Sequence, residues 1–206
     1  KRLGRWLEQQ HPGVGWRACV DADPLLDKAW AEEAGLGWIG KHSNLIHHQR
    51  GSWMVIGHLL TTLDLPPDQP GEPLCGRCHR CIDACPTDAI REPFVVDSRR
   101  CLAYHTIENR SPQLPEAIQA ALGPWLAGCD ICQEVCPWNE GPLPCSEDPD
   151  VQPRPWILSL QRDQALSWDD ATWLEKLRGS ALRRIKPWMW RRNAEAARVE
   201  SPLTLN

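Results

Sequence analysis

The sequence predicts an α+β protein built from three consecutive parts, residues 1–70, 71–145 and 146–206. Helical and strand patterns alternate in the first part, eight of the ten cysteines lie in the second between Cys75 and Cys136, and the third has helical patterns only. Proline-containing stretches separate the parts and predict linkers. With 206 residues, 42% of them apolar, the chain is long enough to bury a core.

The first part is expected to hold a helix, two strands and a glycine-rich loop, at residues 2–10, 16–20, 52–60 and 35–41. A second helix is expected from Asp23-Pro24, with Asp23 as its N-cap and Pro24 as its first residue. Gly35 predicts the end of that helix. The glycine-rich loop is of a kind that lets backbone N–H groups approach a ligand.

The later parts are expected to be helical. A helix that carries Cys101 is predicted in the second part, and Ser167-x-x-Asp170 predicts the start of a helix in the third. The full set of expected helices covers residues 98–109, 115–122, 167–177, 181–185 and 190–199.

The charge balance excludes a basic field over the whole chain. Lys and Arg total 23 against 27 Asp and Glu, a net charge of −4, so nucleic-acid binding would need a local patch. No apolar run approaches the roughly 20 residues that cross a bilayer, and no signal peptide is recognisable. We therefore expect a cytoplasmic monomer with no membrane partner. The chain begins at Lys1 without an initiator Met, which suggests a fragment.

The cysteines form two closely spaced runs that each end in Cys-Pro, namely Cys75-x2-Cys78-x2-Cys81-x3-Cys85-Pro86 and Cys129-x2-Cys132-x3-Cys136-Pro137. The first run has the spacing of bacterial ferredoxins, in which three thiolates hold one [4Fe–4S] cluster and the fourth ligates another. The second run has Leu126 where its first cysteine would stand, and Cys101 is the nearest spare thiol. Two clusters are predicted, ligated by Cys75, Cys78, Cys81 and Cys136 and by Cys85, Cys101, Cys129 and Cys132.

Zinc and disulfide bonds are the alternatives for these cysteines. The Cys-x2-Cys pairs could hold one tetrahedral zinc ion, but this would leave four cysteines and both Cys-Pro steps unexplained. A disulfide framework is disfavoured because no export signal is present. Cys19 and Cys145 lie outside the spacing pattern and are expected to be ordinary thiols.

Residues 176–198 carry eight basic side chains against Glu195 alone, with Trp188 and Trp190 among them. Basic groups neutralise phosphates and aromatic rings stack on unpaired bases, so this segment is a candidate RNA surface. The alternative is a solvated helix face with both tryptophans in the core. The candidate phosphate contacts are Arg183, Arg184, Arg191 and Arg192.

Several motifs, in order along nearly the whole chain, resemble the epoxyqueuosine reductase family: Val20-Asp21-x-x-Pro24, Ala34–Lys41, the first cysteine run, Cys101–Glu108 and Gly128–Asn139. The resemblance implies a cobalamin-dependent enzyme with two [4Fe–4S] clusters that performs the last step of queuosine synthesis on tRNA. Residues 1–70 would then be a partial corrinoid-binding region, because the family's N-terminal segment is missing. Residues 71–145 would form a two-cluster ferredoxin-like domain.

The resemblance also implies roles for individual residues. Asp21 corresponds to the family's proton donor, which the leaving epoxide oxygen needs because an alkoxide is a poor leaving group; a turn-forming role is the alternative. Cob(I)alamin would reduce the epoxide at the wobble base, fed by the clusters. The partners would be the tRNA anticodon loop and an unidentified low-potential electron donor. No histidine is expected on cobalt, and the candidate cobalamin contacts are Asp21, Lys41, His42, Ser43, Leu45, His47 and Tyr104.

Two other functions remain open on the sequence. A ferredoxin-like electron carrier would explain the cysteines but not Asp21 or the loop at residues 35–41. A corrinoid reductive dehalogenase would share the two clusters and the cobalamin.

Overall fold

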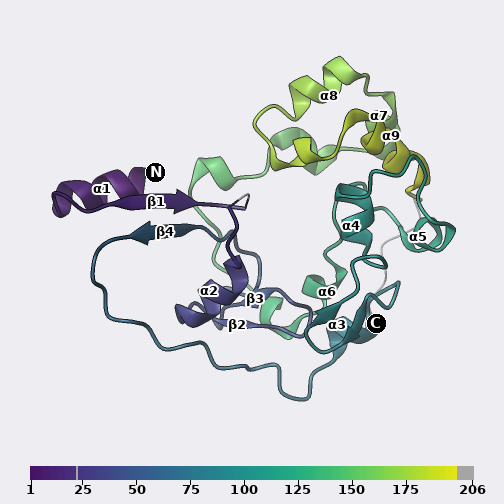
Figure 1. Ribbon diagram of the computed structural model, residues 1–206. Coiled ribbons are helices and arrows are strands. Elements are labelled where there is room, and N and C mark those ends of the chain that lie inside the picture. Colours follow the sequence, from purple (N-terminus) through teal and green to yellow (C-terminus); the bar gives the residue numbers. More distant parts are fainter. Residues whose placement is uncertain (22, 199–206) are drawn as a thin grey trace. The chain divides into compact units, whose positions relative to one another are not determined.

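The computed structural model describes residues 1–21 and 23–198, which form short helices and three two-stranded antiparallel sheets (Figure 1). They divide into two compact units. The first unit contains residues 1–80 and 133–144, and the second contains the described residues from 81 to 132 and from 145 onward. The three consecutive parts expected from the sequence are therefore not the compact units, because the cysteine-rich part contributes to both.

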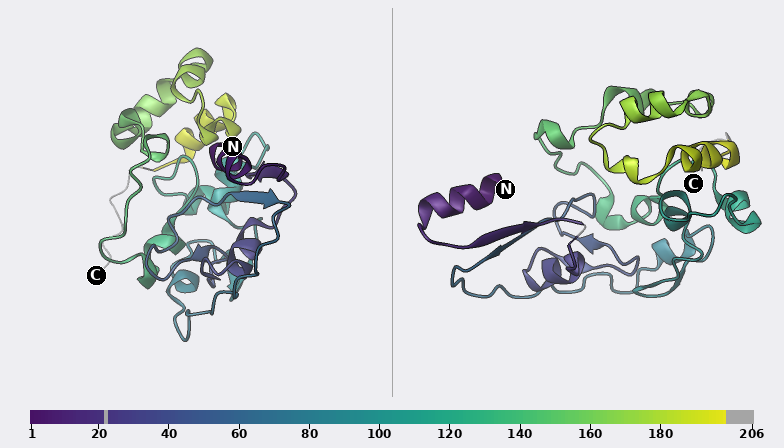
Figure 2. Two further views of the ribbon diagram at one scale, coloured as in Figure 1. Left: turned by 90° about the vertical axis from the view of Figure 1, so that its left-hand side faces the viewer. Right: turned by 45° about the horizontal axis from the view of Figure 1, so that its top comes forward.

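The first unit contains two of the sheets. Strand β1 pairs with β4, placing Cys19 opposite His58, and β2 pairs with β3, placing Trp38 opposite Ile46. Figures 1 and 2 show β1 and β4 as a two-stranded ribbon beside α1. The elements are α1 (Arg2–Gln10), β1 (Trp16–Cys19), α2 (Asp27–Glu33), β2 (Trp38–Ile39), β3 (Leu45–Ile46), β4 (His58–Thr61) and the 3-10 turn η1 (Pro137–Asn139).

Helix α1 packs on β1 through a glycine. A Cβ atom at Gly4 would lie 2.2 Å from the Trp16 ring, so only glycine allows this close approach. The helix expected at residues 2–10 is confirmed, and the strand expected at 16–20 is confirmed for all but its last residue.

Three expectations for this unit need correction. Helix α2 begins at Asp27 with Leu26 as its N-cap, so Asp23 is not the cap. The strand expected at 52–60 is β4, which begins only at His58. It is half-buried rather than buried, and it pairs with β1. The glycine-rich loop is partly a strand, because β2 lies within it.

The second unit is mainly helical. Its elements are α3 (Arg80–Asp83) and α6 (Ile131–Glu134) at the unit boundaries, the hairpin β5 (Ile90–Glu92) and β6 (Val95–Val96), and α4 (Leu102–Ile107), α5 (Glu116–Ala121), η2 (Pro149–Val151), η3 (Pro155–Ser159), α7 (Arg162–Ser167), α8 (Asp170–Lys176), η4 (Ala181–Arg184) and α9 (Pro187–Ala196). The β5–β6 hairpin and α7 have no counterpart in the sequence expectations.

The expected C-terminal helices are present with different ends. Asp169 caps α8 by accepting a hydrogen bond from the Thr172 N–H at 2.7 Å, whereas Ser167 is the last residue of α7. Residues 181–184 form a 3-10 turn rather than an α-helix. Residue 199, the last of the helix expected at 190–199, lies outside the described residues.

An apolar core joins α7, α8 and α9. Trp190 is buried there and stacks on Trp168, with ring centroids 5.2 Å apart. Trp188 lies on the other side of α9 and is 39% exposed, with the Arg192 guanidinium 5.4 Å from its ring centroid. The two tryptophans of the basic segment thus have different environments. Across the described residues, no helix combines the length and apolar character that a bilayer span requires.

Candidate functional site

Four thiols gather in the second unit. Burial raises the pKa of Cys132 to about 12 and that of Cys129 to about 11, and the nearby Cys85 and Cys101 groups raise both pKa values further. Cys85 lies in the loop after α3, where its sulfur accepts a hydrogen bond from the Ala89 N–H at 3.2 Å. Cys101 is the N-cap residue of α4 rather than a residue within the helix. These four cysteines and Cys81 are thus electrostatic neighbours in the second unit, and the assignment of four of them to one cluster stays a prediction.

Three further thiols gather in the first unit. Burial raises the pKa of Cys136, and the nearby Cys75 and Cys78 groups add to the increase. Cys136 packs in an apolar cluster with Trp38 and Ile46, so β2 and β3 support this group. Cys81, the fourth cysteine predicted for the first cluster, belongs to the second unit, where it contributes to the raised pKa of Cys132.

The donor set consists of thiols, which fits iron–sulfur clusters. Buried thiols with raised pKa values hold their protons until a metal replaces them, and thiolate is the ligand that iron–sulfur clusters use. Among the described residues, no three His, Cys, Asp or Glu side chains converge closely enough to hold one metal ion. The interpretation as iron–sulfur ligands therefore depends on the cysteine spacing and on the donor type.

Lys41 supports the loop of the first cysteine run. Its Nζ donates hydrogen bonds to the carbonyls of Gly76 at 2.8 Å and Cys78 at 2.7 Å. The ammonium group of Lys41 thus holds the backbone between two predicted ligands, and its predicted contact with the corrinoid stays a prediction.

A polar cluster anchors the loop that follows Cys136. Asn139 Oδ1 accepts from the Ser52 N–H at 2.7 Å, and Asn139 Nδ2 donates to Ser52 Oγ at 2.8 Å and to the Gln133 carbonyl at 2.7 Å. Sequence reasoning gave Ser52 no role in the site. No signal in the sequence identifies it, because its partner lies 87 residues away.

Asp21 lies in the exposed turn after β1 and has a left-handed backbone, with φ of 52°. The base of this turn is fixed by Asp23, whose Oδ2 accepts from the Val20 N–H at 3.2 Å and whose Oδ1 lies 2.5 Å from Arg17 Nη2. The hydrogen bond from Arg17 lowers the pKa of Asp23. This pairing explains why Asp23 does not cap α2.

His42 is the most unusual titratable group near β2 and β3. It is 4% exposed, and burial lowers its pKa to about 4, with a smaller contribution from the charge of Lys28. Its Nδ1 accepts from the Asn44 N–H at 3.2 Å, while its Nε2 is buried and has no hydrogen-bond partner among the described residues. Ser43 follows with φ of 64°. An unpaired buried nitrogen in a strained turn fits contact with a polar ligand.

The other candidate corrinoid residues have varied surroundings. Leu45 is buried in β3. His47 Nδ1 accepts from the Gln49 N–H at 3.0 Å, and its ring stacks on His48. Tyr104 is exposed on α4 of the second unit, so the structure groups it with the second set of cysteines rather than with residues 41–47.

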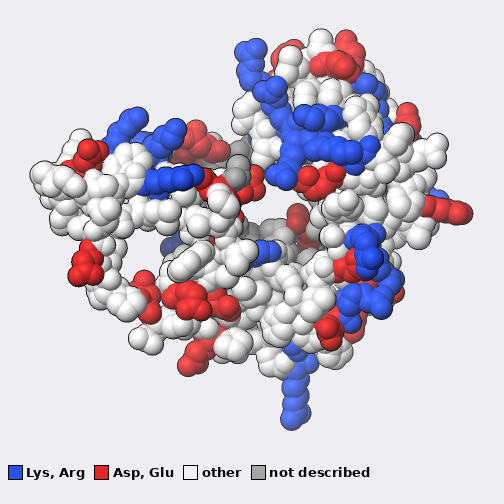
Figure 3. Space-filling model, viewed as in Figure 1, with Lys and Arg blue, Asp and Glu red and all other residues white. Residues whose placement is uncertain are grey.

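The predicted phosphate contacts also differ from one another. Arg183 is exposed, Arg184 pairs with Glu108, and Arg191 pairs with Asp170 at 2.7 Å. Arg192 is only 7% exposed. Its guanidinium group donates hydrogen bonds to the Asn193 side-chain oxygen and to three backbone carbonyls, those of His105, Asn109 and Ser111. Arg192 is therefore a structural residue, which corrects its assignment to the RNA surface. Figure 3 shows Lys and Arg side chains gathered over the C-terminal helices.

Comparison with known proteins adds to this geometry. Residues 74–139 match a family model described as a 4Fe-4S double cluster binding domain. An epoxyqueuosine reductase of Synechococcus sp. (strain CC9605) is 72% identical over 205 residues, covering 100% of this chain and 64% of that protein. The epoxyqueuosine reductase of Synechocystis sp. is 50% identical over 196 residues, covering 95% of this chain and 68% of that protein. The chain thus spans about two thirds of the length of these relatives.

Solved structures agree with the sequence relatives. A crystal structure of epoxyqueuosine reductase with an epoxyqueuosine-modified tRNA-Tyr stem loop matches with a TM-score of 0.88 at 30% identity, covering 95% of this chain and 51% of that chain. A Bacillus subtilis epoxyqueuosine reductase matches with a TM-score of 0.87 at 29% identity over the same shares of both chains. In that structure, a catalytic loop that carries an aspartate is swung out of the active site.

Proposed function

The chain belongs to the epoxyqueuosine reductase family, and from that membership we propose that the protein containing it reduces epoxyqueuosine in tRNA to queuosine. The observation that carries the proposal is the alignment of almost the whole chain with curated members at up to 72% identity. The substrate follows from the family name and from the relative solved with a modified tRNA stem loop.

Two [4Fe–4S] clusters would supply electrons, in a ferredoxin-like domain over residues 71–145. The match to a double cluster binding domain and the grouping of four thiols in the second unit support this reading. The proposed ligands are Cys75, Cys78, Cys81 and Cys136 for one cluster and Cys85, Cys101, Cys129 and Cys132 for the other.

We propose that residues 1–70 contribute part of a cobalamin site. Cobalamin, when bound, supplies a strongly reducing cobalt centre that stores two electrons. The buried Nε2 of His42 would contact the polar rim of the corrinoid, since neutral imidazole is favoured there and no protein partner satisfies it. Lys41 would act indirectly, by holding the backbone of the cluster-binding loop at Gly76 and Cys78.

Asp21 would donate a proton from its carboxyl group to the epoxide oxygen as the carbon–oxygen bond breaks. Without that proton the leaving group is an alkoxide, which leaves poorly. The turn held by Asp23 and Arg17 would present this carboxyl group to the substrate.

The tRNA surface would lie on η4 and α9. Exposed Arg183, together with Arg184 and Arg191, would contact phosphates of the anticodon stem, and Trp188 offers an exposed ring for stacking. The reaction would take place in the cytoplasm, where tRNA is modified.

The decisive experiment is expression of the full-length protein in a bacterial strain that accumulates epoxyqueuosine, followed by mass spectrometry of tRNA nucleosides. Conversion of epoxyqueuosine to queuosine is expected, and the Asp21→Asn protein is the matched control. A protein with intact clusters that forms no queuosine would favour the electron-carrier alternative. Release of halide from a chlorinated alkene without queuosine formation would favour the dehalogenase alternative.

A further inference from the structure

The second unit contains an arginine pocket that the proposed reaction does not use. This cavity of about 610 Å³ is lined by Arg91, Val95, Val96, Asp97, Arg99 and Arg100, among others, at the β5–β6 hairpin. Three guanidinium groups face one carboxylate, and a second carboxylate, Asp88, lies 3.3 Å from Arg100. Counted over the pocket lining and Asp88, the arginines exceed the carboxylates by one positive charge, in a chain whose net charge is −4.

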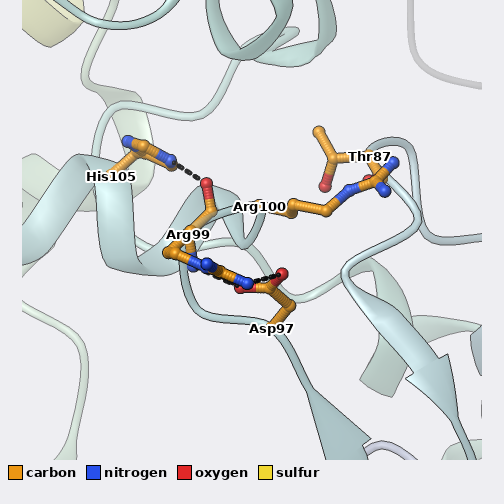
Figure 4. Close-up of polar contacts among 5 residues, drawn as sticks. All are labelled: Thr87, Asp97, Arg99, Arg100 and His105. Atoms are coloured by element: carbon orange, nitrogen blue, oxygen red, sulfur yellow. Dashed lines mark hydrogen bonds and ion pairs between the residues drawn. The ribbon is translucent and has the colours of Figure 1, made fainter.

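The arginine pocket is built on the loops that carry ligands of the second cluster. Arg100 immediately precedes Cys101, and its Nε donates to the Thr87 carbonyl at 2.7 Å, two residues after Cys85. Figure 4 shows Arg100 reaching toward Thr87, with Asp97 and Arg99 paired beside it. The His105 ring, on α4, donates to the Arg99 carbonyl at 2.8 Å. A molecule docked here would therefore lie against the backbone of two predicted ligands.

The rim of the arginine pocket is partly apolar. Phe94 stands at the hairpin tip with φ of 72° and is 51% exposed, and Val95 beside it is also exposed. The register of the hairpin shifts between Ile90 and Glu92, so Arg91 has no paired partner residue in β6. Exposed apolar side chains beside charged groups are also found in transient protein interfaces.

We propose that the arginine pocket is the docking surface for an acidic, low-potential electron-carrier protein. This inference rests on the proposed function, because it names the partner that reduces the same clusters. The step is one electron transfer: the carrier loses one electron and the second cluster gains it, with no bond formed or broken and no proton moved.

Charge and geometry favour a protein carrier over RNA at this surface. The guanidinium groups of Arg99 and Arg100 are already engaged with a carboxylate and a carbonyl, so they are poorly placed for bidentate phosphate contacts. Asp97 and Asp88 compensate the charges of these two groups. The exposed Arg91 therefore supplies the excess positive charge, which steers an acidic partner and raises the association rate.

The test uses the full-length protein with both clusters and an acidic plant-type [2Fe–2S] ferredoxin as the probe. Calorimetry measures ferredoxin binding, and stopped-flow absorbance measures cluster reduction by ferredoxin and by dithionite. Arg91→Glu is the main variant because Arg91 is exposed, and Arg5→Glu in α1 is the matched charge reversal. Arg99→Gln is a second variant that removes one charge without reversing it.

We expect Arg91→Glu to weaken ferredoxin binding about five- to tenfold at low ionic strength and about twofold at high salt, because rim charges are screened. Reduction by dithionite and binding of a tRNA stem loop should be unchanged, and Arg5→Glu should match the wild type. Arg99→Gln should give a smaller loss in the same direction.

Unchanged ferredoxin binding in Arg91→Glu would overturn the inference, as would an equal slowing of reduction by ferredoxin and dithionite. Weaker tRNA binding with unchanged ferredoxin binding would identify the pocket as an RNA surface instead. None of these measurements needs queuosine formation, so failure of the proposed function would be seen separately.

Discussion

Arg17 and Asp23 form an ion pair, Nη2 to Oδ1 at 2.5 Å, that closes the turn carrying Asp21. Asp23 also accepts from the Val20 N–H, so one carboxylate fixes both the strand end and the start of the turn. Asp21 itself has a left-handed backbone, which a non-glycine residue adopts at a cost unless its surroundings hold it.

We expect Asp23→Ala to lower the rate of queuosine formation about three- to tenfold while leaving both clusters intact, because a misplaced catalytic group slows the reaction. Asp23→Asn should lose less, since its amide oxygen can still accept from the Val20 N–H. Single-turnover kinetics measure the rate of the chemical step, and steady-state kinetics show whether kcat or KM changes. Equal rates in both variants and the wild type would rule out a positioning role.

Asp21→Asn is expected to lower the rate of queuosine formation by at least about 100-fold, because an amide is a very poor proton donor. Iron content and tRNA binding should stay at wild-type levels, since Asp21 is exposed and carries no part of either core. Nucleoside analysis of treated tRNA measures the loss. Substantial turnover by this variant would show that another group protonates the epoxide oxygen.

Cys132→Ser is expected to lower the iron content from about eight to about four atoms per chain, because each [4Fe–4S] cluster needs its cysteine ligands. Cys145→Ser is the matched control and should keep all the iron, since Cys145 is exposed and outside the motif spacing. Iron analysis with electron paramagnetic resonance of the reduced protein measures both. Equal iron contents in the two variants would contradict the ligand assignment.

The stability of the first unit is expected to fall as the pH drops from about 6.5 toward 4. His42 has a pKa near 4 in the fold and an ordinary value when unfolded, so the unfolded chain binds more protons in this window. The free energy of unfolding should therefore fall by up to about 1.4 kcal/mol for each unit by which the pH is lowered in this window. Thermal unfolding of the wild type and His42→Gln at pH 5 and pH 7.5 checks this, and an equal pH dependence in both would contradict it.

Arg192→Leu is expected to destabilise the second unit by about 3 kcal/mol, because the carbonyls of His105, Asn109 and Ser111 lose their buried donor. Arg183→Ala should change the free energy of unfolding by less than about 0.5 kcal/mol. It should instead reduce the salt dependence of tRNA binding by about one charge. Urea unfolding and salt titrations separate the two roles, and a reversed pattern would contradict the assignment of Arg192 to the fold.

Local patterns in the sequence were sufficient for several features of this protein. The helical pattern of residues 2–10 predicted α1. A helix depends on residues close in the chain, whose spacing is constrained by backbone geometry. The family motifs indicated Asp21 for the same reason, because the motif is contiguous.

The tertiary structure decided which charged residues are available for binding. Arg192 and Arg183 look alike in the sequence, yet Arg192 is buried against α4 and the loop after it, where the carbonyl of Asn109, 83 residues earlier, accepts its hydrogen bond. Asp23 has the sequence context of a helix cap, but the guanidinium of Arg17 on β1 competes for its carboxylate. Burial and ion pairing depend on which distant segments of the chain contact one another. The local sequence pattern does not contain that information.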